Sequence, residues 1–208
     1  SKLIQDKIMD FEIWSDRYRE YYPGQIEYYD ENLESACEKS PTFESMSRSA
    51  QTRGYLLKEE FVNICEWKTP RARRHYQKND ENTIQETTKR IIGEYPDTKR
   101  QLNELVELKG VGVPVASAIL TVIYPTKYCI VDFRVWNSLL WLEHKRASLD
   151  SYSSFIEFID SFRKYDDIDS YIKYLDRIRN LSNENGMAPR NIEMALWQFD
   201  KNRGILGD

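Results

Sequence analysis

Apolar side chains recur at intervals of three and four residues along most of the chain. This spacing puts them on one face of an α-helix, so each segment that shows it predicts a helix. Tyr128–Val131, which is apolar and β-branched, also suits an extended conformation. The pattern as a whole predicts an all-α fold. The predicted helical segments are Leu3–Ile13, Phe61–Trp67, Ile84–Ile92, Leu102–Leu108, Val115–Ile123, Val135–Leu142, Phe155–Phe162, Ile168–Ile178 and Ile192–Phe199.

Prolines and capping residues mark where several of these helices begin and end. Thr69-Pro70 and Ala188-Pro189 each put proline at the expected start of a helix, where its missing N–H costs nothing. Asp167 precedes an amphipathic segment that it can cap. The last helix is expected to end before Gly204. The stretch Lys39–Tyr55, rich in Ser, Thr and Arg, predicts a loop or a short helix.

The composition is that of a folded protein. With 208 residues, 40% of them apolar and 31% charged, the chain can bury a core as one domain or as two small lobes. Its longest apolar stretches, Ala116–Tyr124 and Val135–Leu142, are too short to cross a bilayer. No leader-like segment is recognisable at Ser1. We therefore expect a cytoplasmic protein that does not enter a membrane.

The net charge and the cysteines narrow the classes of function. A formal net charge of −4 argues against nucleic-acid binding by the whole surface, although a local basic patch remains compatible with it. Cys37, Cys65 and Cys129 lie far apart in the sequence. Their spacing fits buried thiols rather than a disulfide framework, a zinc site or a four-cysteine iron–sulfur cluster.

Two glycines separate two predicted helices in the segment Leu108-Lys109-Gly110-Val111-Gly112, and Pro114 follows near the start of the second helix. Paired glycines permit positive φ angles and a close approach of another molecule. They also expose backbone N–H groups at a helix start, where an anion is favoured. A plain corner between two helices that needs two glycines is the alternative interpretation, and for this short pattern alone it is the commoner one.

Asp132 stands twenty residues after Gly112, where an apolar run ends and another helix is expected to begin. An aspartate at this place is an ordinary helix N-cap. An N-cap aspartate that follows a phosphate-binding hairpin at this distance is a more specific combination.

The pattern Leu-x-Gly-Val-Gly-x-x-x-Ala from Leu108 to Ala116, followed by Asp132, resembles the helix–hairpin–helix DNA glycosylases. The resemblance is strongest over Glu60–Leu140. It implies an all-α, two-lobed fold with the active site between the lobes, and double-stranded DNA with a modified or damaged base as the partner.

The same resemblance divides the single unit 1–208 into two lobes. Residues 57–140 would form a core with the wedge, the hairpin and the catalytic aspartate. Residues 1–56 and 141–208 would form the second lobe.

The resemblance also implies roles for individual residues. Asp132 would stabilise the positive charge that develops at C1′ as the glycosidic bond breaks, and would orient the attacking water. The hairpin would contact DNA through Lys109, Gly110, Gly112, Val113 and Val115. No cofactor is required, but a structural sodium or potassium ion would be held by the backbone carbonyls of Val106, Leu108 and Val111.

Departures from the family pattern refine this expectation. Family members that also cut the strand carry a nucleophilic lysine where this chain has Pro114, so we expect a monofunctional enzyme that leaves an abasic site. The adenine-removing members of the similar oxoguanine/adenine branch carry a glutamate where Asn63 stands. Asn63 is therefore expected to read the base, with Glu66 and Glu60 as weaker candidate acids. Glu66 equally fits a solvated helical face together with Glu59 and Glu60.

Trp67-Lys68-Thr69 occupies the place of the wedge that, in the family, fills the gap left by a flipped base. A basic run follows the tryptophan, without an acidic residue before Asn79: Lys68, Arg71, Arg73, Arg74, His75 and Lys78. Such runs are often only solvated, but beside a wedge we interpret this one as a phosphate-contacting patch. Arg134 is expected to pair with Asp132 or to contact the DNA backbone.

These features predict a monomeric DNA glycosylase that flips out a modified base and hydrolyses its glycosidic bond. The departures favour an unusual target, such as a modified cytosine of phage DNA removed as antiviral defence, over base-excision repair of a damaged base. A non-catalytic DNA-binding module remains an alternative, in which Asp132 only caps a helix. A nuclease is a further alternative, although the sequence offers no clear carboxylate pair near the hairpin.

Overall fold

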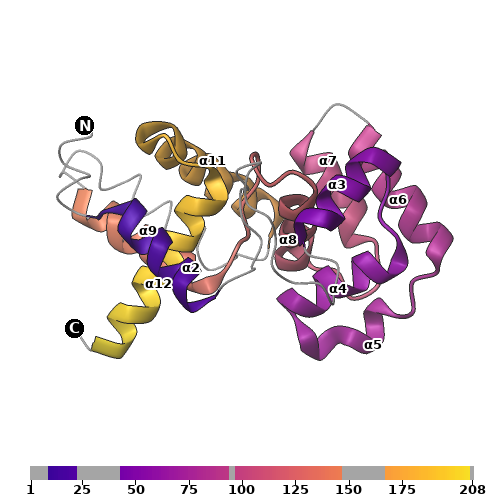
Figure 1. Ribbon diagram of the computed structural model, residues 1–208, viewed down its shortest axis with the longest axis horizontal. Coiled ribbons are helices and arrows are strands. Elements are labelled where there is room, and N and C mark those ends of the chain that lie inside the picture. The colour runs from indigo at the N-terminus through magenta and orange to yellow at the C-terminus, as the bar shows by residue number, and fades with distance from the viewer. Residues whose placement is uncertain (1–8, 23–42, 94–96, 147–166, 207–208) are drawn as a thin grey trace. The chain divides into compact units, whose positions relative to one another are not determined.

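The computed structural model describes residues 9–22, 43–93, 97–146 and 167–206 (Figure 1). Every regular element in these ranges is a helix, and residues 128–131 are neither helix nor strand. The expected all-α character is thus confirmed for the described residues, while the helix predicted at 155–162 lies outside them. The elements are α2 (Phe11–Tyr21), α3 (Phe43–Arg53), α4 (Lys58–Lys68), the 3-10 helix η1 (Pro70–Ala72), α5 (Arg73–Tyr76), α6 (Glu81–Gly93), α7 (Thr98–Val106), α8 (Val113–Ile123), α9 (Phe133–Arg146), α11 (Ile168–Asn185) and α12 (Pro189–Leu206).

The chain forms two compact units. The hairpin unit comprises Gly24–Ile130, and the terminal unit combines Ser1–Pro23 with Val131–Asp208. These boundaries differ from the expected division at 57 and 140, because α3 packs on α8 within the hairpin unit and α9 packs on α12 within the terminal unit. No helix in the described ranges has both the length and the apolar character that crossing a bilayer requires.

The hairpin unit is built around α8, which packs against α3, α4 and α7 (Figure 1). Almost every side chain of α8 is buried, from Val113 through Ile123. A helix that is apolar on all sides is stable only inside a core, so its sequence fixes it at the centre of the unit. The turn before α8 is thereby attached to the most deeply buried element.

Helix α3 confirms the short-helix alternative for Lys39–Tyr55 in the part of this stretch that the structure describes. Met46 and Ala50, four residues apart, are buried on one face of this 11-residue helix. The side chains of Ser47 and Gln51 donate hydrogen bonds to the carbonyl of Ile123 at the C-terminal end of α8. These long-range contacts stabilise a helix whose Ser- and Thr-rich composition gives it a weak intrinsic tendency to form.

Several helix ends also differ from the expected ones. Helix α2 begins at Phe11 rather than near Leu3, because the Asp10 carboxylate accepts the Ile13 N–H at 3.1 Å and caps it there. Asp167 is the N-cap residue of α11 but makes no capping hydrogen bond through its side chain. Helix α12 continues through Gly204 to Leu206 instead of ending before it, as a glycine within a helix costs only about 1 kcal/mol.

In the terminal unit, α12 packs against α2, α9 and α11 (Figure 1). Arg190 and Glu193, one turn apart on α12, form an ion pair and are 1% and 2% exposed. The Arg190 guanidinium also donates to the Tyr18 hydroxyl of α2 at 3.3 Å. Burial by itself lowers the pKa of Arg190, but attraction to Glu193 and Tyr18, together with the hydrogen bonds to both, outweighs it and raises this pKa above its ordinary value. The buried Arg190–Glu193 pair therefore links α12 to α2.

We predict that Glu193→Ala lowers the free energy of unfolding by about 3–5 kcal/mol, because the substitution leaves the buried guanidinium of Arg190 without its carboxylate partner. Urea unfolding followed by circular dichroism measures this. Asp176→Ala, which removes an exposed carboxylate from α11, is the control and should change stability by no more than about 0.5 kcal/mol. Equal effects of the two substitutions would show that the buried pair does not stabilise the terminal unit.

Candidate nucleic-acid interface

The predicted hairpin is a tight turn between α7 and α8 in the hairpin unit. Helix α7 ends at Val106, and α8 begins at Val113 with Pro114 at its second position. Within the turn, the Val111 N–H donates to the Leu108 carbonyl at 3.1 Å. The chain reverses at Gly110, whose φ is +84°. The helix–turn–helix geometry expected from the glycine pattern is therefore present in this segment.

The fold requires glycine at only one of the two glycine positions of the turn. A Cβ atom on Gly110 would lie 2.8 Å from Cβ of His75 and 2.9 Å from the ring of Tyr76, and the positive φ disfavours any other residue. Gly112 has an ordinary extended conformation, and a Cβ there would meet only Pro114, at 3.8 Å. The fold thus requires glycine at 110 but not at 112, where the missing side chain leaves open space in front of α8.

The buried side chain of Asn79 fastens this turn to residues 68–78, which carry the basic run and are called the basic segment below. Its Oδ1 accepts the Lys109 N–H at 2.8 Å, and its Nδ2 donates to the Lys109 carbonyl at 3.0 Å. The same Nδ2 donates to the Tyr76 carbonyl at 3.0 Å. One amide therefore satisfies both backbone groups of Lys109 and holds them against α5. Sequence reasoning missed Asn79, because its partner lies 30 residues away and nothing local marks the contact.

The basic run lies on η1, α5 and the turn that follows them, next to the hairpin. Lys68, at the end of α4, is half-buried. Arg73 is not wholly available to a ligand, because its Nε lies 2.7 Å from Oε1 of Glu66. The structure thus places two separately predicted features, the hairpin and the segment that carries the basic run, in direct contact. The exposed cationic residues of the two features are Arg71, Arg73, Arg74, Lys78 and Lys109, with His75 beside them.

The turn offers backbone donors beside these cations. Gly110 and Gly112 are exposed, and in the described part of the chain their N–H groups have no hydrogen-bond acceptor. The N–H groups of Val113 and Val115 belong to the first turn of α8, which has no intrahelical acceptors. The side chains of these two valines are buried, so only their backbone could meet a ligand. Backbone donors at a helix start favour an anion.

The carbonyls of Val106, Leu108 and Val111, expected to hold a monovalent cation, belong to the end of α7 and the turn. Carbonyls at a helix C-terminus have no intrahelical donor and carry the negative end of the helix dipole. The Leu108 oxygen accepts the Val111 N–H, but a carbonyl oxygen has a second lone pair. These neutral oxygen donors fit a sodium or potassium ion. Within the described ranges, His, Cys, Asp and Glu side chains form no group of three that could hold a metal.

The expected wedge is packed within the hairpin unit. Trp67, near the end of α4, makes an edge-to-face contact with Phe43 of α3, with ring centroids 5.3 Å apart. The Thr69 carbonyl accepts the Tyr76 hydroxyl at 3.0 Å. Asn63 is half-buried on α4. Of these residues, Trp67 and Thr69 therefore have structural contacts that account for them without a flipped base.

The three acidic residues of α4 do not together form the solvated face that was one interpretation of them, because only Glu59 is exposed. Glu60 is buried, accepts the Leu57 N–H at 3.0 Å and pairs with Arg53 at 2.7 Å, so it caps α4. Glu66 is half-buried against Arg73. Cys65 on the same helix is buried, and burial raises the pKa of its thiol, which makes it a poor nucleophile.

Asp132 lies in the terminal unit, directly before α9. Its Oδ1 accepts the Arg134 N–H at 2.9 Å, and its carbonyl accepts the Trp136 N–H at 3.1 Å. The expected N-cap is therefore present, and the carboxylate is held at a helix start. The Arg134 guanidinium does not take the Asp132 carboxylate as its ion-pair partner: it pairs with Asp200 of α12 at 3.2 Å and lies over the ring of Trp197.

Aromatic rings and cations gather beside Arg134 in the terminal unit. The Trp197 ring makes edge-to-face contacts with Tyr18 and Tyr22 of α2, at 5.5 and 5.3 Å between centroids. The Lys201 ammonium lies 5.2 Å from the Trp197 centroid and bonds the Tyr22 hydroxyl. No local pattern in the sequence indicates this cluster, because its residues come from opposite ends of the chain.

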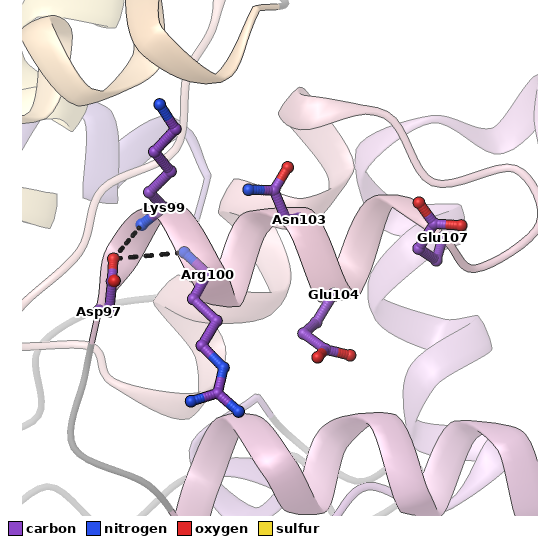
Figure 2. A pocket seen from close by; sticks show the side chains of 6 residues that line it. All are labelled: Asp97, Lys99, Arg100, Asn103, Glu104 and Glu107. Carbon is purple, nitrogen blue, oxygen red and sulfur yellow. Dashed lines mark hydrogen bonds between the residues drawn. The ribbon is translucent and has the colours of Figure 1, made fainter.

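A hollow of about 370 Å³ lies along α7, and Figure 2 shows the side chains that line it. Asp97 caps the helix there by accepting the N–H groups of Lys99 and Arg100. The lining combines charges of both signs and contains none of the predicted site residues, so we assign it no ligand. It consists of Asp97, Lys99, Arg100, Asn103, Glu104 and Glu107.

Comparison of the chain with protein-family models, curated proteins and solved structures finds no match to any of them. The case for a function therefore depends on the residues and contacts described above.

We predict opposite outcomes for alanine at the two hairpin glycines. Gly110→Ala should lower the free energy of unfolding by about 2 kcal/mol or more, because it adds a clash to an unfavourable φ. Gly112→Ala should change it by less than about 1 kcal/mol, since alanine fits there and only weakens an N-cap. Thermal unfolding of both variants measures the difference. Equal losses of stability would contradict the described packing of Gly110 on His75 and Tyr76.

Proposed function

We propose that the chain is a monofunctional DNA glycosylase, which holds duplex DNA by its phosphates and hydrolyses the glycosidic bond of a modified base. The observation that carries the DNA-binding part is the contact between the hairpin and the basic segment. Gly110 packs directly on His75 and Tyr76, so exposed backbone donors and exposed cations lie on one surface. Such a surface suits a phosphate backbone even in a protein of net negative charge.

In this proposal the hairpin and the basic segment contact successive parts of the DNA backbone. The amides of Gly110 and Gly112 bind one phosphate, and the open space at Gly112 lets an oxygen approach α8 closely. The exposed side chains of Arg71, Arg74 and Lys109 supply positive charge around it. These contacts do not read the base sequence; they position the duplex.

Asp132 performs the chemical step in this proposal. As the bond between C1′ and the base nitrogen breaks, the bonding electrons leave with the base and positive charge develops at the sugar. The Asp132 carboxylate stabilises this charge and accepts the proton of a water whose oxygen bonds to C1′. Asp132 then gives this proton up to solvent, and the departing base takes a proton from solvent at the nitrogen that left, so that the products are the free base and an abasic site. The Arg134 N–H fixes one oxygen of the carboxylate at the start of α9.

Water rather than lysine is the nucleophile in this mechanism, because Pro114 has no amine. A hypermodified base, such as a modified cytosine of phage DNA, is the first substrate class to test. The support for it is the set of departures at Pro114 and Asn63, together with the formal net charge of −4.

A DNA-binding module without catalysis is the second candidate, and the capping role of Asp132 favours it. The hydrogen bond from Arg134 explains an aspartate at this position without any reaction. Both candidates predict binding of duplex DNA. They differ in whether a base is released.

We predict that the wild-type protein releases free base from a DNA with modified bases, and that Asp132→Asn abolishes this release while retaining duplex affinity. Asparagine caps helices as well as aspartate does, so the variant keeps α9 but lacks the negative charge. The panel includes duplexes with oxidised, deaminated and alkylated bases and phage genomes with modified cytosine. Mass spectrometry detects the free base, and alkali-labile breaks locate the abasic sites.

A chelator in parallel reactions excludes a metal-dependent nuclease, because glycosylase products persist in its presence. Retained release by Asp132→Asn would remove Asp132 from the mechanism. Binding without release from any DNA of the panel would favour the binding module. Covalent trapping of the wild-type protein on DNA by borohydride would contradict attack by water.

A further inference from the structure

Asn79 is the one side chain that hydrogen-bonds both the basic segment and the hairpin turn in the described part of the hairpin unit. Its side chain is buried, with 4% of the residue exposed, and no DNA contact was assigned to it above. Its three hydrogen bonds join the Tyr76 carbonyl on α5 to both backbone groups of Lys109. We propose that Asn79 is a positioning residue that makes the hairpin and the basic segment one rigid phosphate-binding surface.

This inference rests on the proposed DNA binding, and the geometry explains why an amide is needed. The Lys109 N–H needs an acceptor and its carbonyl needs a donor, and a single amide side chain supplies both. Because both groups are bonded to Asn79, they cannot turn toward a ligand. The next residue, Gly110, reverses the chain and begins the part of the turn that presents exposed N–H groups.

Side-chain contacts of the neighbours strengthen the same link. Lys109 Nζ lies 3.5 Å from the Lys78 carbonyl. Lys58 Nζ donates to the Gln77 carbonyl at 2.8 Å, which fastens the other side of the segment to α4. Asp80, directly after Asn79, caps α6 by accepting the Thr83 N–H at 2.7 Å, and hydrogen bonds from Thr83 lower its pKa. The backbone on both sides of Asn79 is therefore held by hydrogen bonds of its neighbours, which fixes the direction of the Asn79 amide toward Lys109.

Asn79→Asp tests the inference because it keeps the size of the side chain. The carboxylate still accepts the Lys109 N–H, but it cannot donate to the two carbonyls and repels them. The distance between the hairpin and the basic segment should then vary. The protein would therefore contact fewer phosphates of the duplex at the same time. We predict at least a tenfold loss of duplex affinity. We also predict that the slope of log affinity against log salt concentration becomes smaller in magnitude by about 1–2.

Gln101→Glu is the matched control. Gln101 is also a buried amide: it donates to the Ile91 carbonyl at 3.2 Å and accepts the Tyr128 hydroxyl at 2.6 Å. It lies in the first turn of α7, at the opposite end of that helix from the hairpin. Its substitution should destabilise the unit to a similar extent while leaving the salt slope unchanged. A change of slope in Asn79→Asp alone therefore separates positioning from general loss of stability.

The measurement is fluorescence anisotropy of a labelled duplex titrated at several salt concentrations. If the wild type does not bind, the proposed function fails and the inference fails with it. If the wild type binds and Asn79→Asp binds with the same affinity and slope, only the inference is overturned. If Asn79→Asp does not fold, the inference is tested by amide hydrogen exchange of the wild-type protein, measured with and without the duplex. The Lys109 and Gly110 amides should then gain protection together on DNA binding, and unchanged protection at both would overturn the inference.

Discussion

The packing of the hairpin turn on the basic segment is the contact on which the proposed interface depends. Gly110 permits it, because any side chain there would clash with His75 and Tyr76. Asn79 fixes it by bonding both backbone groups of Lys109. Helix α8, buried on nearly every side, anchors the turn to the core of the hairpin unit. The charges and the backbone donors share one surface only because these three constraints act together.

The terminal unit has a different kind of organisation. Two ion pairs lie within it, Arg190 with Glu193 and Arg134 with Asp200. Asp132 is held by the helix that it caps. A hydrogen-bonded cap restricts the movement of a carboxylate, which is a physical requirement for a group that must stabilise charge at one carbon atom. A purely structural aspartate would make the same hydrogen bond. Only a measurement of base release therefore distinguishes the two roles.

Local patterns predicted much of this structure, and contacts distant in sequence explain what they missed. Apolar periodicity predicted α4, α6, α8 and α11, and the glycine pattern predicted the turn before α8. Helix α3 depends on its contacts with Ile123, which no local rule can detect. Asn79 escaped notice for the same reason. Trp67 suited a wedge by its place in the chain, but its contact with Phe43 could not be inferred from the sequence.

Titration of the isotope-labelled protein with a short duplex, followed by amide NMR, tests the central claim most directly. The shared surface predicts that the amide signals of Gly110 and Gly112 shift together with those of Arg74 and Lys78. The signal of Asn103, in the hollow along α7, should remain in place. Shifts confined to the hollow, or shifts of the basic segment without the two glycines, would contradict a phosphate-binding hairpin.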